Sequence, residues 1–273
     1  ADTMAKLANG IADNLLTVTT LAAQCPLVIA PAMDGGMFAH PATQKNLETL
    51  KGCGATVVGP AEGHLASGLV GPGRMSEPAE ILGCARMVLG KSGKLAGKKI
   101  VITAGGTQEA LDPVRVITNH SSGKQGYAVA QAAIDAGADV CLITAPTALT
   151  PPVGARVVKV KSAQDMLEAV LSEPADALIM AAAAADFTPK TVAKDKMKKR
   201  DGIPQVELTA APDILKTVAS QQRSLFKVVV GFAAESQHLL ENATEKLKSK
   251  KLDLIVANDI SSIDAGFAVD TNR

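Results

Sequence analysis

The sequence ITAGGTQEALDPVRVITNHSSGKQGYAVA at residues 102–130 decides the fold of this chain. It begins inside an apolar segment, 99–104, that has the character of a strand buried in a parallel sheet. Two glycines, Gly105 and Gly106, follow this segment. A helical pattern starts at residue 123, after a second cluster of small residues, Ser121 and Ser122. Small residues between a strand and a helix let backbone N–H groups approach an anion, which the helix dipole favours. An ordinary turn needs only one glycine, so we predict a phosphate-binding loop formed by Gly105, Gly106, Ser121, Ser122 and Gly123.

The composition excludes several classes of protein. The 273 residues are 47% hydrophobic and 20% charged, which is typical of a globular protein with one large or two ordinary domains. A net charge of +1, one Tyr and no Trp argue against nucleic acid as a partner. The four cysteines form no CxxC pair, which favours reduced thiols in the cytoplasm over a zinc site or a disulfide framework. No apolar run is long enough to span a membrane, and we expect no membrane partner.

Strand and helix patterns alternate on both sides of the opening stretch, which predicts parallel sheets. Before it we expect helices at 3–23, 41–50 and 77–89 and strands at 25–30 and 55–59. A glycine-rich loop is expected at 63–74. From it onward we expect strands at 99–104, 139–144, 155–160, 176–182, 227–233 and 252–258. Helices are expected between them at 123–136, 162–172, 212–221 and 236–250. The predicted fold class is therefore α/β, with two tandem open parallel-sheet units.

A small polar segment separates the two units. Residues 90–97 have no apolar periodicity, which is typical of an interdomain linker. We expect domains at 1–90 and 99–273, joined by residues 91–98. The chain does not begin with Met, and its first helical pattern starts almost at once, as in a piece of a longer protein.

Polar clusters follow the predicted strands of the second unit, where ligands bind in open α/β sheets. The basic segment 190–202 follows one of these strand ends and has little apolar content, as expected of a mobile flap. A predicted helix places Lys246 and Lys250 four residues apart, on one face. Lysines from a flap and a helix suit a polyphosphate better than a single carboxylate. The alternative is that these lysines form a solvated surface.

Competing motifs are absent. No GxGxxG follows residue 104, and Lys124 lacks the flanking residues of a Walker A loop. Tyr127 has Gln131 four residues later, so a Tyr-x-x-x-Lys dehydrogenase pair is not available. There is no GxSxG elbow, and the four histidines lack metal-ligand spacing. A Rossmann oxidoreductase is therefore disfavoured, and the sequence leaves any metal site unknown.

At this point the sequence resembles a known family, the bacterial bifunctional phosphopantothenoylcysteine decarboxylase/phosphopantothenate–cysteine ligases of coenzyme A biosynthesis. The ligase half is matched by AGGTxExxDPVR at 104–115, NxSSGK at 119–124, an alanine run ending in Asp at 181–186, KxKK at 196–199, GFAAE at 231–235 and LDLIVAN at 252–258. The decarboxylase half is matched by AKLANGIAD at 5–13, PAMxxxM at 31–37 and GxGRM at 71–75. The resemblance implies a partial flavodoxin-like domain followed by a Rossmann-like ligase domain.

The resemblance also implies the chemistry. The family's ligase activates 4′-phosphopantothenate with CTP and Mg²⁺, giving an acyl-cytidylate, and the amine of L-cysteine then displaces CMP. The decarboxylase half uses FMN and gives 4′-phosphopantetheine. We therefore expect small-molecule substrates, FMN in the full-length protein, and a homo-oligomer built from a synthetase dimer and the decarboxylase domains.

Functional residues carry over to matching positions. Asn119 matches the asparagine that recognises the acyl-cytidylate, and Lys196 matches a flap lysine that closes over this intermediate. The implied CTP-binding positions are Met180, Ala181, Ala182, Asp186, Lys196, Pro212, Asp213, Ile214, Leu215, Phe232, Lys246 and Lys250. In the decarboxylase half, Met33 and Asp34 match substrate-binding positions, and Ser67 stands where the family has a proton-donating cysteine.

The decarboxylase half departs from the family pattern. Asp34 replaces the asparagine that clamps the substrate carboxylate, Ser67 replaces cysteine, and Asp2 stands where asparagine is expected. A serine hydroxyl is a far weaker acid than a thiol, whose pKa is about 8.5. The catalytic histidine and most of the FMN site would precede residue 1, and the family continues past Asn272 with strands that help to form its dimer. These departures argue against decarboxylation by this chain alone, and a non-catalytic nucleotide- or flavin-binding assembly module remains the alternative function.

Overall fold

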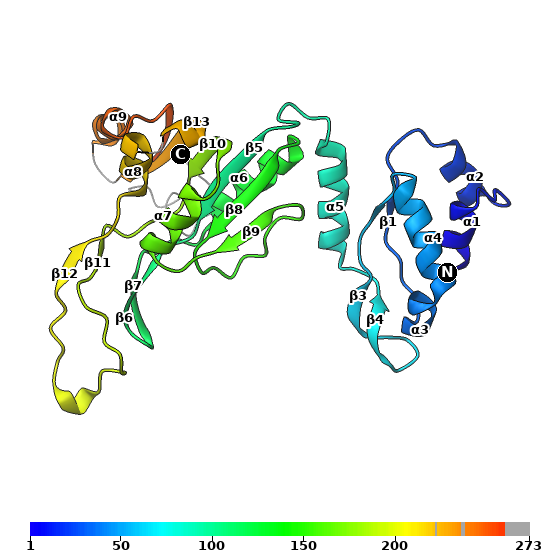
Figure 1. The fold of residues 1–273 in the computed structure, drawn as a ribbon, viewed down its shortest axis with the longest axis horizontal. Helices are drawn as coiled ribbons and strands as arrows, with labels where there is room; N and C mark the ends of the chain where they lie inside the picture. Colours follow the sequence, from blue (N-terminus) through cyan, green and yellow to red (C-terminus); the bar gives the residue numbers. More distant parts are fainter. Residues whose placement is uncertain (222, 236–237, 260–273) are drawn as a thin grey trace. The chain divides into compact units, whose positions relative to one another are not determined.

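The computed structural model of this chain describes residues 1–221, 223–235 and 238–259 (Figure 1). The chain divides into two compact units, Ala1–Lys91 and Ser92–Arg273. We call them unit 1 and unit 2. Within the described residues, no helix is long and apolar enough to cross a membrane.

Unit 2 is built on a parallel sheet of six strands in the order β14-β13-β10-β5-β8-β9, which confirms the predicted α/β class (Figure 1). The strands are β5 Lys99–Ala104, β8 Asp139–Thr144, β9 Arg156–Lys159, β10 Ala175–Met180, β13 Phe226–Glu235 and β14 Leu254–Asp259. The first strand of this sheet, β5, lies in its middle. The chain then adds β8 and β9 on one side of β5 and returns to add β10 on the other side. Ligands bind at such a reversal in strand order, outside the carboxyl ends of the strands.

Four helices of unit 2 lie near their predicted positions: α6 Lys124–Asp135, α7 Ala163–Leu171, α8 Ile214–Gln221 and α9 Leu239–Ser249. On one face of the sheet, α7 and α8 pack against the strands. Their buried side chains form one apolar cluster with those of β5, β8, β10 and β13. On β5 and β8 the alternate residues Ile100, Ile102, Val140 and Leu142 are at most 5% exposed. These residues point to the other face, where α6 contacts both strands. Both faces are covered, so the two strands are continuous apolar runs in the sequence.

Two antiparallel hairpins of unit 2 were not predicted: no strand was expected between residues 104 and 123, and the predicted flap at 190–202 lies between the two strands of the second hairpin. They pair β6 Gln108–Asp112 with β7 Arg115–Thr118, and β11 Phe187–Pro189 with β12 Leu208–Ala210. In the first hairpin, the Asp112 carboxylate accepts hydrogen bonds of 2.8 Å from the Val114 and Arg115 amides, which closes the turn. Both hairpins project from the sheet in Figure 1. The Ala193 amide donates to the Leu111 carbonyl at 3.0 Å, so the segment between β11 and β12 lies along β6.

Unit 1 has a parallel pair, β1 Val28–Ile29 and β2 Thr56–Val57, and five helices among its described residues. The helices are α1 Asp2–Ala8, α2 Leu15–Ala22, α3 Gly35–Ala39, α4 Pro41–Gly52 and α5 Pro78–Gly90. The prediction of one helix over 3–23 is wrong, because Gly10 has a φ of +68° and Asn14 starts α2 with a capping box. The expected glycine-rich loop is the antiparallel hairpin β3 Ala61–His64 and β4 Val70–Arg74.

Candidate active site

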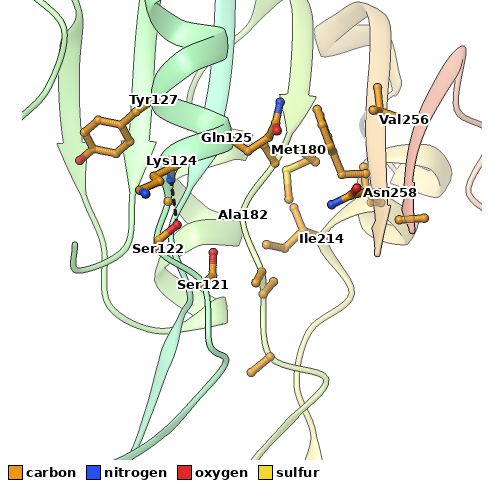
Figure 2. Close-up of a pocket in the computed structure, with 18 of the residues that line it drawn as sticks. Ser121, Ser122, Lys124, Gln125, Tyr127, Met180, Ala182, Ile214, Val256 and Asn258 are labelled. Carbon is orange, nitrogen blue, oxygen red and sulfur yellow. Dashed lines mark hydrogen bonds between the residues drawn. The ribbon is translucent and has the colours of Figure 1, made fainter. Parts of the chain in front are cut away.

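A cavity of about 830 Å³ lies in unit 2, where the sequence placed the ligand (Figure 2). Its lining comes from the start of α6, the ends of β10, β13 and β14, the first turn of α8 and the last turn of α9. A volume of this size is typical of a site for a small molecule. Of the implied CTP-binding positions, Lys196 alone is not part of the lining: the lining contains Met180, Ala181, Ala182, Asp186, Pro212, Asp213, Ile214, Leu215, Phe232, Lys246 and Lys250.

One side of the cavity is the start of α6 and the loop before it. Gly123 caps this helix with a φ of +79°, a conformation that favours glycine. The Lys124 amide donates to Ser122 Oγ at 3.4 Å (Figure 2), and Thr147 Oγ1 donates to the Ser122 carbonyl at 3.1 Å. Ser121, Ser122 and Gly123 all line the cavity, so the amino end of α6 faces it, and a helix amino end favours an anion.

Gly105 and Gly106 belong to the predicted phosphate loop but are not part of the cavity lining. They allow chain segments to approach one another behind it. A Cβ on Gly106 would lie 2.8 Å from the Asn119 carbonyl oxygen. Gly105 has a φ of +80°, and its carbonyl accepts a hydrogen bond of 2.9 Å from the Ala183 amide. These glycines therefore position the cavity wall formed by residues 181–185.

Buried threonines hold that wall from behind. Thr103 Oγ1 accepts from the Ala182 amide at 3.1 Å, and Thr107 Oγ1 accepts from the Ala185 amide at 2.9 Å. Both threonines are 0% exposed. Because alanine side chains end at Cβ, residues 181–185 line the cavity with methyl groups and main chain.

Asn119 contacts the same wall from the end of the β6–β7 hairpin. Its Nδ2 lies 3.2 Å from the Ala183 carbonyl oxygen and 3.4 Å from that of Ala184, and donates to both. Asn119 is exposed and lies beside the cavity rather than in its lining. Its amide donors therefore bind the wall of the site.

Replacing Thr107 with valine should lower the free energy of unfolding of unit 2 by about 1–3 kcal/mol. Valine has nearly the same shape but cannot accept from the Ala185 amide, which then stays buried without a partner. Urea denaturation followed by circular dichroism measures the change. Thr209→Val on exposed β12 is the matched control, with an expected change within about 0.5 kcal/mol. Equal effects in the two variants would contradict this role for Thr107.

Two lysines form the cationic side of the cavity. Lys246 Nζ donates to the Phe232 carbonyl at 2.7 Å, and Lys250 Nζ lies 2.9 Å from Asp213 Oδ2. Burial raises the pKa of the Asp213 carboxyl, but hydrogen bonds from Lys250 and the Lys216 amide outweigh it and hold the pKa below its ordinary value. Asp213 is therefore ionised at neutral pH and holds the Lys250 ammonium in the cavity.

Several lining residues were not predicted from the sequence. Gln125, Tyr127, Leu149 and Thr150 line the cavity, and Gln125 and Tyr127 are labelled in Figure 2. Tyr127 had been considered only as a dehydrogenase residue, yet its hydroxyl lies 3.2 Å from Thr144 Oγ1 at the end of β8. The rule that ligands bind beyond the carboxyl ends of strands also applies to the segment after β8 and could have found Leu149 and Thr150.

In unit 1, two of the three residues that depart from the family pattern, Asp34 and Ser67, are in contact. Ser67 Oγ donates to Asp34 Oδ2 at 2.6 Å, and the Gly36 amide donates to Asp34 Oδ1 at 2.9 Å. These two hydrogen bonds, with that of Ser67 the stronger influence, hold the pKa of Asp34 below its ordinary value. Met33, the residue before, is anchored by its amide to the Gly73 carbonyl at 2.9 Å. Asp34 and Ser67 thus form one hydrogen-bonded pair.

Comparison with known proteins decides the family. Residues 95–273 match the family model "DNA/pantothenate metabolism flavoprotein C-terminal domain", and residues 1–90 match the model "Flavoprotein". The chain is 50% identical over 277 residues to the Coenzyme A biosynthesis bifunctional protein CoaBC of Bacillus subtilis, covering 100% of this chain and 68% of the relative. This chain belongs to the CoaBC family.

Other members and solved structures agree with this assignment. The CoaBC protein of Mycobacterium tuberculosis is 46% identical over 288 residues, covering 100% of this chain and 69% of the relative. A crystal structure of a CoaBC C-terminal domain is 46% identical, with a TM-score of 0.55, and covers 62% of this chain and 80% of that one. A DNA/pantothenate metabolism flavoprotein from Streptococcus pneumoniae is 27% identical, with a TM-score of 0.54, and covers 65% of this chain and 91% of that one. The resemblance seen in the sequence motifs is thereby confirmed, and the chain is a member of an enzyme family of coenzyme A biosynthesis with decarboxylase and ligase domains.

Proposed function

We propose that unit 2 ligates 4′-phosphopantothenate to L-cysteine, using CTP. The observation that carries the proposal is the cavity itself, which has the α6 anion-binding start on one side and Lys246 and Lys250 on the other. A nucleoside triphosphate presents several negative oxygens to such a site, and fixed ammonium groups stabilise them electrostatically.

The proposed reaction has two steps. The carboxylate of 4′-phosphopantothenate attacks the α-phosphate of CTP, forming an acyl-cytidylate and releasing pyrophosphate. The cysteine amine then attacks the acyl carbonyl, forming the amide and releasing CMP. Charge builds up on pyrophosphate and then on CMP, so Lys246, Lys250 and Lys196 are proposed to stabilise leaving groups rather than to act as bases. Closure of the flap would exclude water from the acyl-cytidylate.

Magnesium is proposed as a companion of the nucleotide. Among the described residues, no three His, Cys, Asp or Glu side chains gather in a metal-binding cluster. Mg²⁺ prefers one or two carboxylates together with substrate phosphates and water. Asp186 lines the cavity and is the carboxylate proposed to contact it, since Asp213 is paired with Lys250.

For the full-length protein we propose FMN-dependent decarboxylation, supported by the flavoprotein match of residues 1–90. Both carboxylate oxygens of Asp34 already accept hydrogen bonds within unit 1, from Ser67 and Gly36. We propose that the Asp34–Ser67 pair binds the substrate of the decarboxylase.

Measuring pyrophosphate release tests the ligase. With CTP and 4′-phosphopantothenate the chain should release pyrophosphate, and L-cysteine should allow continuous turnover. Omitting 4′-phosphopantothenate is the control, because release should then stop; ATP in place of CTP tests the choice of nucleotide. Measurable CTP binding without release under any condition would favour the alternative, a non-catalytic nucleotide-binding assembly module.

Replacing Lys250 with alanine should weaken CTP binding about 10- to 100-fold, as expected for a charge-assisted contact. The substitution removes one ammonium and leaves the Asp213 carboxylate unpaired beside the incoming phosphates. Isothermal titration calorimetry gives the affinity. Lys248→Ala is the matched control, because Lys248 lies on the same helix, is exposed and is outside the cavity lining. An unchanged affinity in Lys250→Ala would exclude Lys250 from the nucleotide site.

A further inference from the structure

The flap between β11 and β12 is held to the β6–β7 hairpin at Met197. The Met197 amide donates to Asp112 Oδ2 at 3.0 Å, and the Met197 carbonyl accepts from Arg115 Nη1 at 3.1 Å. The same Arg115 nitrogen also donates to Asp112 Oδ2. Both backbone polar groups of one flap residue are thus bound by a single ion pair. We call this arrangement the Asp112 latch.

Asp112 is a buried side chain, with the residue 2% exposed. Its Oδ1 accepts from the Val114 and Arg115 amides, and its Oδ2 accepts from Met197 and the Arg115 guanidinium. Burial raises the pKa of the Asp112 carboxyl, but these donors outweigh it and hold the pKa below its ordinary value. The carboxylate therefore stays ionised at neutral pH and accepts from all its donors at once.

The latch acts on the residue next to Lys196. Lys196 is exposed and lies on the flap, outside the cavity lining. A lysine side chain has large rotamer freedom, and its backbone on a free flap would add more. Fixing the amide and carbonyl of Met197 removes the backbone part of this freedom without touching the ammonium.

We propose that Asp112 is a positioning residue of the ligase, which sets the place of the flap lysine Lys196 through Met197. The inference deepens the proposed function and rests on it. Asp112 contacts neither the nucleotide cavity nor the reacting atoms; it acts through the flap. Loss of the latch should reduce turnover far more than nucleotide affinity, since Lys246 and Lys250 bind in the cavity independently of it.

Asp112→Asn is the most specific variant. Asparagine can keep its oxygen toward the Val114 and Arg115 amides, so the hairpin turn survives. Its NH₂ group then faces two donors, the Met197 amide and the Arg115 guanidinium, and cannot accept from either. Asp165→Asn is the matched control: it removes another carboxylate that accepts from backbone amides, those of Lys161 and Ser162, at the start of α7.

Limited digestion of the full chain with trypsin tests the latch without any substrate. The flap contains Lys194, Lys196, Lys198, Lys199 and Arg200 as cleavage sites. In Asp112→Asn, cleavage within residues 194–200 should become at least about fivefold faster than in the wild type or Asp165→Asn. Equal cleavage rates in the three proteins would show that Asp112 does not hold the flap. This outcome does not depend on whether unit 2 is a ligase.

Turnover tests the positioning role. Asp112→Asn should lower kcat at least about tenfold while changing the Kd of CTP less than about threefold. In the Lys196→Ala background, Asp112→Asn should have almost no further effect, because the group that it positions is gone. Effects that multiply in the double variant, or an unchanged kcat, would overturn the proposal. A wild-type chain with no turnover would instead contradict the proposed function, while the digestion result on the latch stands.

Discussion

Replacing Lys196 with alanine should lower kcat for ligation at least about 100-fold. Lys196 is the flap cation next to the residue held by Asp112 and Arg115, and we propose that it stabilises the leaving phosphates when the flap closes. Removing one preorganised donor to developing charge costs about 100- to 1,000-fold in kcat. The loss should appear mainly in kcat, because the cavity retains Lys246 and Lys250. Steady-state assays of pyrophosphate release measure it.

The matched control for this variant is Lys194→Ala. Lys194 is an exposed lysine of the same flap, so the control removes the same charge two residues away from Lys196. Its kcat should stay within about twofold of the wild type. A loss of similar size in both variants would show that the flap acts through its total positive charge rather than through one placed ammonium.

Replacing Gly126 with valine should lower the free energy of unfolding of unit 2 by at least about 3 kcal/mol. A Cβ at this position would lie 2.6 Å from Ala104 Cβ and 2.8 Å from the Thr103 carbonyl oxygen, so α6 could not stay against β5. Backbone cannot move aside as a flexible side chain does. The displaced helix would also carry Ser122 and Gly123 away from the cavity. CTP binding should therefore weaken as well as the stability of unit 2.

Denaturation in urea and calorimetric titration with CTP measure the two effects of Gly126→Val. Ala132→Val, at an exposed position of the same helix, is the control and should cost no more than about 0.7 kcal/mol, the difference in helix propensity. A Gly126→Val protein as stable as this control would show that α6 does not need close contact with β5.

The sequence predicted the central part of unit 2 well, and the physical reason is burial. The strands at 99–104 and 139–144 have the predicted bounds, because residues on both of their faces are apolar and cannot be mistaken for loops. The β6–β7 hairpin was missed because a side chain closes its turn. Asp112 closes the β6–β7 turn and binds Met197, which lies 85 residues further along the chain. No periodicity within a segment can reveal a partner at that distance.

The residues predicted for the candidate site divide into those that line the cavity and those that lie behind it. Ser121, Ser122 and Gly123 lie at the cavity, whereas Gly105 and Gly106 from the same predicted loop lie behind its wall. Both clusters contain small residues for a steric reason, and the sequence does not say whether the close neighbour is a ligand or another segment of the chain. Asn119 shows the same ambiguity, since its amide binds the alanine wall.

The alanine wall at residues 181–185 has a consequence for inhibitors. Its polar groups belong to the main chain, and Thr103, Thr107 and Asn119 hold them in place. A compound that hydrogen-bonds to this wall depends on atoms that every amino acid except proline retains. A point mutation there can resist such a compound only by adding bulk to the cavity or by shifting the loop. If the cavity binds the nucleotide as proposed, either change would also obstruct the nucleotide, so resistance at this wall would cost ligase activity.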